Sequence, residues 1–416
     1  MAYIPEQKAL RKIQMLADLP PWQMEVVTEA IEPVDVVEGS LLVERGTDDG
    51  YTYFLTEGRI ALDTENGQHK TVQVTPDTTR TPVANLRPRI ISVKALTRLR
   101  GFRVPDIVLS AAGCGRRTYE ADDIKVESQE EEERRQLESK LSFRLYRDLQ
   151  NDKAILPSLP DLAMRIRRAI DDDMSSAREV SKLVEADPAM ATKLLKVANS
   201  AYFGGANSIE TLSHAVVRLG MQTTKQLVVS FALRDVFRNK DPQIQQRMQR
   251  LWRHSANIAA LSFVLAGRVG TIEPEEALLV GLVHDVGTIA ILNYLEKFPA
   301  LADDPEALEE TISNMRGEMG AMILREWKFA PAVVAGARDA EYWTRIQHGA
   351  VDFVDLLIVA QVHDRLRKNE TQGLPPIEKI SAIQRVLGDE AGPEESLQVL
   401  REAKAQVDEM RSVLHG

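Results

Sequence analysis

The hydrophobic positions of residues 1–118 change from helical spacing to short, glycine-punctuated runs that are typical of β-strands. Apolar residues from Leu10 to Leu16 and from Met24 to Ile31 predict two short helices, separated by Leu19-Pro20-Pro21. After Val34, turn residues such as Asn66-Gly67 separate short strands. The predicted strands are Ser40–Glu44, Tyr51–Thr56, Arg59–Asp63, Thr71–Val74 and Arg89–Ala95. This pattern predicts a small β-roll or barrel.

Residues 119–152 are acidic and highly charged, and their spacing predicts a connecting helix. Glu130–Arg134 and Glu131–Arg135 are placed for ion pairs along a helix, and leucine recurs at every fourth position from Leu137 to Leu149. Two interpretations stay open: a solvated connector with one face packed on a neighbour, or a helix through which two copies form a homodimer. A four-residue repeat drifts around the helix and does not maintain a coiled-coil seam.

Residues 153–416 show helical periodicity throughout. Helix starts are indicated at Pro160-Asp161, Ser175-Ser176, Asp187-Pro188 and Glu273-Pro274, because Ser and Asp cap helices and proline suits the first turn. The sequence therefore predicts a multidomain α+β protein. Its predicted parts are a β-roll domain (1–118), an acidic connecting helix (119–152), an all-α domain (153–345) and a C-terminal helical extension packed on that domain (346–416).

Composition narrows the functional classes. The chain has 416 residues, of which 44% are hydrophobic, and this suffices for well-buried cores in two or three domains. The net charge of -10 argues against a nucleic-acid partner, which would require clustered Lys and Arg. The single cysteine, Cys114, excludes an internal disulfide and fits a reducing cytoplasm. The sequence lacks a signal-peptide pattern and an apolar run of roughly 18 residues, so no membrane partner is expected.

Several motifs in the helical part resemble those of the HDOD family. They occur in the family's order and cover about residues 153–345. The motifs are Leu156–Pro160, Glu185–Ala189, Lys193–Ser200, Ser208-Ile209, Ser213–Gly220, Leu251–Ser255 and Gly281–Gly287. The resemblance implies an all-helical relative of the HD-domain phosphohydrolases that serves as a bacterial signalling or regulatory module, often without detectable catalysis.

The resemblance also implies a candidate metal site. Active relatives hold a metal with a histidine, a His-Asp pair and a late aspartate from separate helices. These roles fall on His254, on His284 with Asp285, and on Asp364, and such nitrogen and oxygen ligands suit Mn, Fe, Mg or Zn. The alternative is structural: His284 and Asp285 satisfy each other, His254 is a core histidine, and Asp364 forms a surface ion pair.

A two-metal site is incomplete by this comparison. Two-metal relatives carry further histidines, but this chain has Arg316 at the first such position and no histidine near Arg338. An arginine would repel a second cation. The favoured interpretation therefore assigns no catalytic residue and expects no cofactor. The alternative is a mononuclear, metal-dependent phosphohydrolase.

The β-roll resembles the cyclic-nucleotide-binding domain family over about residues 7–118. The motif runs from Glu38 through the turn glycines to Leu62. The family's phosphate-gripping arginine falls on Arg89, which makes Arg89 the candidate ligand-binding residue. Ile90 and Ile91 replace the small polar residues that should follow it, and the preceding loop has no glycine or glutamate. We expect a degenerate sensor that has lost nucleotide binding.

Together these features predict a cytoplasmic signalling protein. The β-roll would sense a ligand or partner, and the HDOD output module would act by binding another signalling protein. Motion of the connecting helix would transmit the state of one end to the other. A transcription factor is poorly supported, because an acidic helix, and not a helix-turn-helix, follows the β-roll.

Overall fold

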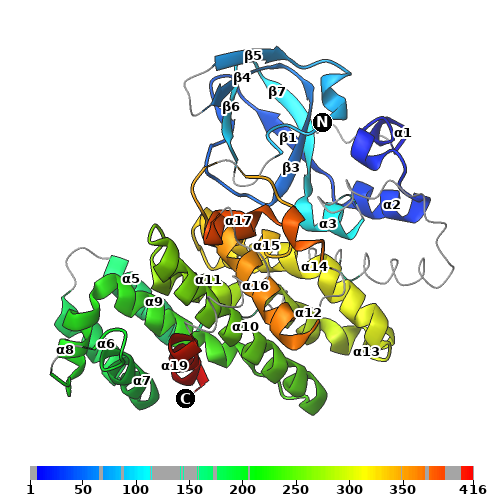
Figure 1. Ribbon diagram of the computed structural model, residues 1–416. Coiled ribbons are helices and arrows are strands. Elements are labelled where there is room, and N and C mark those ends of the chain that lie inside the picture. Colours follow the sequence, from blue (N-terminus) through cyan, green and yellow to red (C-terminus); the bar gives the residue numbers. More distant parts are fainter. Residues whose placement is uncertain are drawn as a thin grey trace. The chain divides into compact units, whose positions relative to one another are not determined.

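The computed structural model of the chain is shown in Figure 1. It describes residues 7–64, 69–85, 89–112, 114, 141, 144, 157, 159–171, 176–204, 207–347, 349–370, 374–388 and 404–415. Two compact units are present: Met1–Ile155 with Tyr294–Ala335, and Leu156–Asn293 with Gly336–Gly416. The boundaries of the four segments stay predictions. Nearly all of the expected 119–152 helix, and therefore the dimer helix, lies outside the described residues.

The first unit contains the β-roll, which is built from two antiparallel sheets. One sheet has the order β1 (Glu32–Val36), β7 (Leu99–Pro105), β3 (Tyr51–Glu57). The other has the order β2 (Leu41–Val43), β6 (Ile91–Ala95), β4 (Arg59–Thr64), β5 (His69–Gln73). The five predicted strands are confirmed, with small shifts at their ends. β1 and β7 were not among them.

The central strand β7 was missed because arginines alternate with its apolar residues. Arg100 and Arg103 lie between Leu99, Phe102 and Val104, and these three are buried. Gly101 is required at this position, since a Cβ there would lie 2.1 Å from the carbonyl oxygen of Phe54. The absence of a side chain lets β3 and β7 approach closely, which places the strand in the middle of the sheet.

Four short α-helices and one long α-helix, α14, accompany the β-roll among the described residues of the first unit. They are α1 (Gln7–Leu10), α2 (Pro21–Glu29), α3 (Asp106–Ala111), α13 (Pro299–Ala302) and α14 (Pro305–Glu326). α3 follows β7 directly and packs on α14, although these two helices are about 200 residues apart in the sequence. The first unit therefore combines the β-roll with a helix from the later part of the chain.

The second unit is helical among its described residues. Its α-helices are α5 (Asp161–Asp171), α6 (Ala177–Glu185), α7 (Pro188–Ala198), α8 (Leu212–Leu219), α9 (Met221–Ala232), α10 (Pro242–Val269), α11 (Pro274–Val283), α12 (Val286–Tyr294), α16 (Phe353–Lys368), α17 (Ser381–Leu387) and α19 (Lys404–His415). α15 (Pro331–Asp339) begins in the first unit and ends in the second, because the division falls after Ala335. α10 is the longest and packs against α11, α16 and α19 (Figure 1). Capping follows the sequence signals: Asp187 caps α7, and Ser176 forms a capping box with Glu179.

One helical stretch is long and apolar enough to cross a membrane by length and composition. It runs from Pro274 to Tyr294, and 94% of its apolar window is buried inside the protein. His284 and Asp285 interrupt this stretch, so it is not the uninterrupted apolar run of about 18 residues whose absence was expected from the sequence. Burial explains the composition, because a helix covered on all sides by protein needs apolar residues around its whole circumference.

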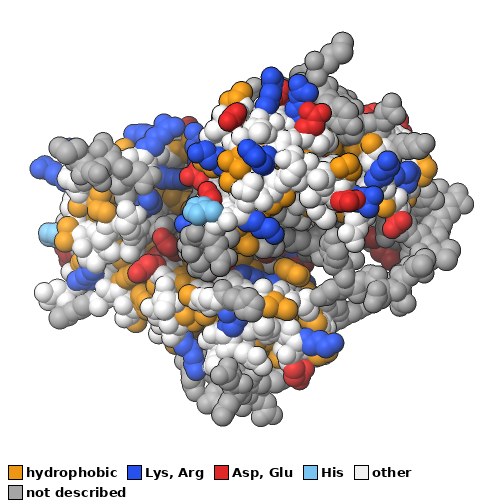
Figure 2. Space-filling model, turned by 90° about the horizontal axis from the view of Figure 1, so that it is seen from above, with side chains coloured by type: hydrophobic (Ala, Val, Ile, Leu, Met, Phe, Trp, Pro, Cys, Tyr) orange, Lys and Arg blue, Asp and Glu red, His pale blue; other side chains and the backbone are white. Residues whose placement is uncertain are grey.

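On the face shown in Figure 2, basic and acidic side chains are interspersed with hydrophobic ones.

Candidate metal centre

His254 lies in the middle of α10. One face of this helix is buried in the core of the second unit. Asp241 caps its first turn by accepting hydrogen bonds from the backbone amides of Gln243 and Ile244. Two residues before His254, the buried Trp252 ring packs edge-on against Phe237 at 5.1 Å between centroids. These contacts fix the helix, and 29% of the His254 side chain stays exposed.

His284 and Asp285 occupy the break between α11, which ends at Val283, and α12, which begins at Val286. The His284 side chain is fully buried, and 5% of the Asp285 side chain is exposed. His284 Nδ1 lies 2.7 Å from the carbonyl oxygen of Gly281. Because a carbonyl only accepts hydrogen bonds, Nδ1 carries the proton and donates it. His284 Nε2 is then the ring nitrogen with a lone pair for a ligand.

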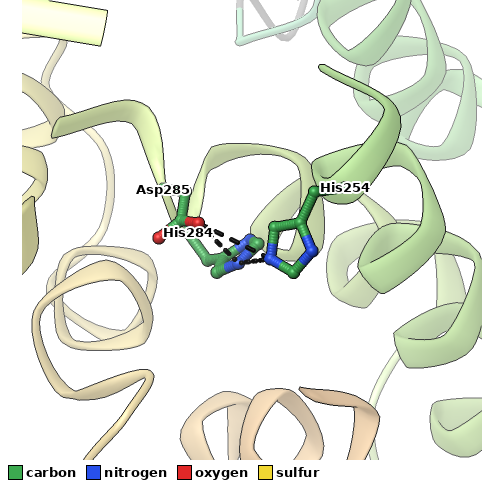
Figure 3. Close-up of side chains that lie close together, drawn as sticks. All are labelled: His254, His284 and Asp285. Carbon is green, nitrogen blue, oxygen red and sulfur yellow. Dashed lines mark hydrogen bonds and ion pairs between the residues drawn. The ribbon is translucent and has the colours of Figure 1, made fainter. Parts of the chain in front are cut away.

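The three side chains converge on one point (Figure 3). His254 Nε2 and His284 Nε2 are 3.3 Å apart, and each lies 3.5 Å from Asp285 Oδ2. Two nitrogens that share a tetrahedral ion, each at 2.0–2.1 Å from it, would be about 3.4 Å apart. The donor spacing therefore fits one divalent ion, held by two imidazoles and one carboxylate. Mn, Fe and Zn suit this set of nitrogen and oxygen donors.

Gly281 allows the two histidines to meet. A Cβ at this position would lie 2.4 Å from the Cα of Ala259 on α10. The absence of that atom lets α11 approach α10 closely, and the Gly281 carbonyl also orients His284. The motif Gly281–Gly287 thus contributes a close helix contact in addition to the His-Asp pair.

Asp364 is placed on the other side of the His254 ring. Its Oδ2 lies 3.6 Å from His254 Nδ1, and Lys368 Nζ lies 2.6 Å from the same oxygen. Arg367 is 2.9 Å from Oδ1. The structure therefore puts Asp364 outside the three-residue group and beside the nitrogen of His254 that faces away from it. A carboxylate in that place orients and polarises a ligating imidazole.

Asp364 is ionised despite being buried. Burial opposes the charge, but interactions with His254, Lys368 and Arg367 outweigh it and hold the pKa of the Asp364 carboxyl well below its usual value. The prediction of an ion pair is therefore confirmed, but it is a buried one, with 2% of the Asp364 side chain exposed. The next residue, Arg365, pairs with Glu341 at 2.9 Å.

Sequence reasoning missed Asn257 as a member of this arrangement. Its Nδ2 donates a hydrogen bond of 2.6 Å to Asp364 Oδ1. The signal was available, because Asn257 follows His254 by three residues and so lies on the same helix face. Arg367 and Lys368 likewise follow Asp364 by three and four residues.

Arg89, the candidate ligand-binding residue of the β-roll, is engaged inside the protein. Its guanidinium is fully buried and donates to Asp49 Oδ1 at 2.7 Å, to the Tyr51 carbonyl at 2.8 Å and to the Ala84 carbonyl at 2.6 Å. The group also lies 5.2 Å from the centroid of the Tyr53 ring. A carboxylate of the chain itself thus pairs with the cation that an anionic ligand would need. Ligand binding by Arg89 stays a prediction.

The second unit is helical among its described residues, and two histidines and an aspartate meet at the break between two of its helices. Residues 156–341 match the family model of the HDOD domain, so the chain carries an HDOD domain. The resemblance drawn from the sequence motifs is therefore confirmed over this range. His254, His284 and Asp285 all lie within it.

Comparisons with known proteins found several chains similar to this one. An uncharacterised protein of Treponema pallidum is 26% identical over 193 residues, which are 43% of this chain and 36% of that protein. The chain therefore matches about a third of this relative's length. A crystal structure from Shewanella amazonensis, described provisionally as a metal-dependent phosphohydrolase, has a TM-score of 0.57 at 23% identity and covers 67% of this chain and 99% of that one. An HDOD domain protein of unknown function from Geobacter sulfurreducens has a TM-score of 0.49 at 22% identity, over 67% and 98% of the two chains.

Proposed function

We propose that this chain is a regulatory signal-transduction protein of the bacterial type, and that its HDOD domain acts by binding another signalling protein. The observation that supports this proposal is the donor count. Among the described residues, one group of His, Cys, Asp or Glu has metal-site spacing, namely His254, His284 and Asp285. Three donors around one point can hold one metal ion. A two-metal hydrolase needs two ions, which together stabilise the attacking and the leaving oxygen.

The surroundings of Arg338 favour the same interpretation. Two-metal relatives would have a histidine near this position, but Arg338 is 96% buried at its side chain and pairs with Asp339 at 3.0 Å. A buried, paired guanidinium is costly to displace and does not ligate metals. We therefore propose that any ion at the three-donor group orders the helix break and does not carry out turnover.

The test is metal content together with hydrolysis. Full-length protein purified without chelator is analysed for Mn, Fe and Zn, and then assayed against bis-p-nitrophenyl phosphate with each metal. We expect at most one ion per chain and no hydrolysis above that of the His284→Ala variant. Metal-dependent turnover that His284→Ala abolishes would overturn the regulatory proposal.

The second candidate is the mononuclear phosphohydrolase, with one ion activating a water molecule. One observation favours it: His254 is 29% exposed, so an ion bound between His254 and the two buried ligands could be reached from solvent. Under this candidate, His254, His284 and Asp285 would hold the ion and Asp364 would orient His254. The same assay separates the two proposals, because only the second predicts turnover.

For partners and location we propose a cytoplasmic protein that binds a signalling protein and does not bind nucleic acid or membranes. A homodimer through the 119–152 segment is part of this proposal and is motivated by the leucine repeat from Leu137 to Leu149. Light scattering of the full chain and of a Leu137→Glu/Leu145→Glu variant tests it. We expect a dimer that the substitutions convert to a monomer; an unchanged mass would remove this segment as the interface.

A further inference from the structure

Helix α14 connects the β-roll to the HDOD sequence. It lies within the matched range 156–341, yet it belongs to the compact unit of the β-roll. α3 mediates part of the packing: Thr52 Oγ1 of β3 donates a hydrogen bond of 2.6 Å to Asp106, the first residue of α3, and α3 packs on α14. Within the first unit, α3 thus connects β3 to α14.

An ion pair fixes the end of α14 to the turn before β3. Arg325 Nη1 lies 2.8 Å from Asp48 Oδ1, and the Asp48 side chain is 1% exposed. The guanidinium also lies over Gly50, where a Cβ would be 2.5 Å from Arg325 Nη2. Asp48 Oδ1 accepts a second hydrogen bond, from the Gly50 amide at 3.2 Å. Because this pair is buried at its acidic partner, water screens it weakly.

The neighbouring carboxylate binds the interior of the β-roll. Asp49 Oδ1 lies 2.7 Å from the fully buried Arg89, and Asp49 Oδ2 accepts a hydrogen bond of 2.9 Å from the Tyr53 hydroxyl. Adjacent residues of one turn therefore face in two directions. Asp48 binds α14, and Asp49 binds the centre of the β-roll.

We propose that the Asp48-Asp49 turn is the joint that couples the β-roll to the HDOD domain through α14. A change that displaces Arg89 would also displace its ion-pair partner Asp49. Because Asp48 and Asp49 are joined by a peptide bond, Asp48 and its partner Arg325 would shift as well. This inference builds on the proposed regulatory function and gives its route of transmission. It is a route separate from the connecting helix 119–152, which lies almost wholly outside the described residues.

Helix α14 is linked along the chain to the candidate metal site formed by His254, His284 and Asp285. α12 begins directly after Asp285 and ends at Tyr294, where the chain enters the first unit. The segment returns to the second unit after Ala335. A displacement of α14 is therefore transmitted at both ends by covalent connections, one of which leads to the His284-Asp285 break.

Hydrogen exchange of the full-length protein, followed by mass spectrometry, tests the coupling. In Asp48→Asn, which keeps the size and removes the charge, we expect the amides in the last turns of α14 to exchange about tenfold faster. In Asp49→Asn, which weakens the contacts of Asp49 with Arg89, the Tyr53 hydroxyl and the Tyr51 amide, we expect the same amides to exchange about threefold faster. The reciprocal variant Arg325→Gln should speed exchange in β3, because coupling between two sites is mutual.

The matched control is Asp35→Asn, which breaks the exposed ion pair of Asp35 with Arg98 on the same β-roll. It should leave α14 unchanged. If Asp49→Asn has no effect on α14 while Asp48→Asn does, the relay is wrong, and if neither has an effect, the joint is wrong. Exchange that rises equally in all peptides also contradicts the proposal, since it shows global unfolding in place of coupling. These outcomes do not depend on metal or partner binding, so they are distinct from a failure of the proposed function.

Discussion

Asp364 and His284 face opposite nitrogens of the His254 ring. Asp364 Oδ2 lies 3.6 Å from His254 Nδ1, whereas His284 Nε2 lies 3.3 Å from His254 Nε2. Asp364 is ionised by its contacts to Lys368 and Arg367, and its negative charge favours a proton on the nearer ring nitrogen of His254, Nδ1. His254 Nε2 is then left as the ligating atom. Asn257 completes the arrangement by fixing the other oxygen of Asp364.

We therefore predict different metal affinities for two Asp→Asn variants. Asp364→Asn should still bind one ion per chain, with an affinity lowered about 10- to 100-fold, because it removes an orienting carboxylate and not a ligand. Asp285→Asn should lose the ion altogether. Competition titration with a chelating dye measures both. Equal losses in the two variants would mean that Asp364 is itself a ligand, as the sequence motif implied.

The close contact of α10 with α11 makes a prediction about stability. In Gly281→Ala, the new Cβ would meet the Ala259 backbone at 2.4 Å and force the helices apart, at a cost of about 1–3 kcal/mol in the free energy of unfolding. The metal affinity should fall as well, since His254 and His284 would separate. Urea denaturation of the full chain measures the first effect and dye competition the second.

Gly267 provides the matched control on α10. A Cβ at Gly267 would have its nearest neighbour, Pro274 Cγ, at 3.9 Å, which is an ordinary contact. Gly267→Ala should therefore stabilise the helix by about 0.5–1 kcal/mol through helix propensity. A destabilisation of similar size in both variants would show that glycine replacement in these helices is harmful for reasons other than the close approach.

The HDOD resemblance named all four residues, His254, His284, Asp285 and Asp364, but it gave Asp364 the same ligand role as the other three. The structure brings three of them together and places Asp364 beside His254. The position of Asp364 depends on which face of α16 meets α10, and motif order contains no information on the ring nitrogen that it approaches. Asn257 carried a usable signal in its three-residue spacing from His254.

In the β-roll, too, local sequence patterns predicted most strands, whereas contacts between residues far apart in the sequence could not be predicted. Five strands follow from local alternation and turn glycines. β7 was missed because Arg100 and Arg103 are held by acidic partners from neighbouring strands, Glu57 and Glu32. The ion pair of Arg89 with Asp49 could not be predicted from local sequence patterns either, because 40 residues separate the two along the chain.

Cys114 should be nearly inert in the folded protein. Burial raises the pKa of its thiol to about 12, and its Sγ lies 3.0 Å from the carbonyl oxygen of Met15. At pH 8 the thiolate fraction would be roughly a thousandfold below that of an exposed cysteine. We expect reaction with Ellman's reagent to be at least about a hundredfold slower in buffer than in urea. Comparable rates in the two conditions would show that Cys114 is accessible in the native state.

The buried imidazole of His363 should make the free energy of unfolding depend on pH. It is fully buried on α16, and burial lowers the pKa of its imidazole to about 4. The unfolded chain binds this proton near pH 6.5, whereas the folded chain does not. Folding stability is therefore lost as pH falls from about 6.5 to about 4, by up to about 3 kcal/mol.

The variant His363→Leu tests this assignment, because it removes the titrating group and fills the same apolar site. Urea denaturation at pH 7.5 and at pH 5 should show a smaller loss of stability in the variant than in the parent chain. The control is His214→Leu, at an exposed position of α8, which should keep the parent's pH dependence. If the parent and His363→Leu lose the same stability between the two pH values, other groups govern the acid sensitivity, and the buried imidazole is not its source.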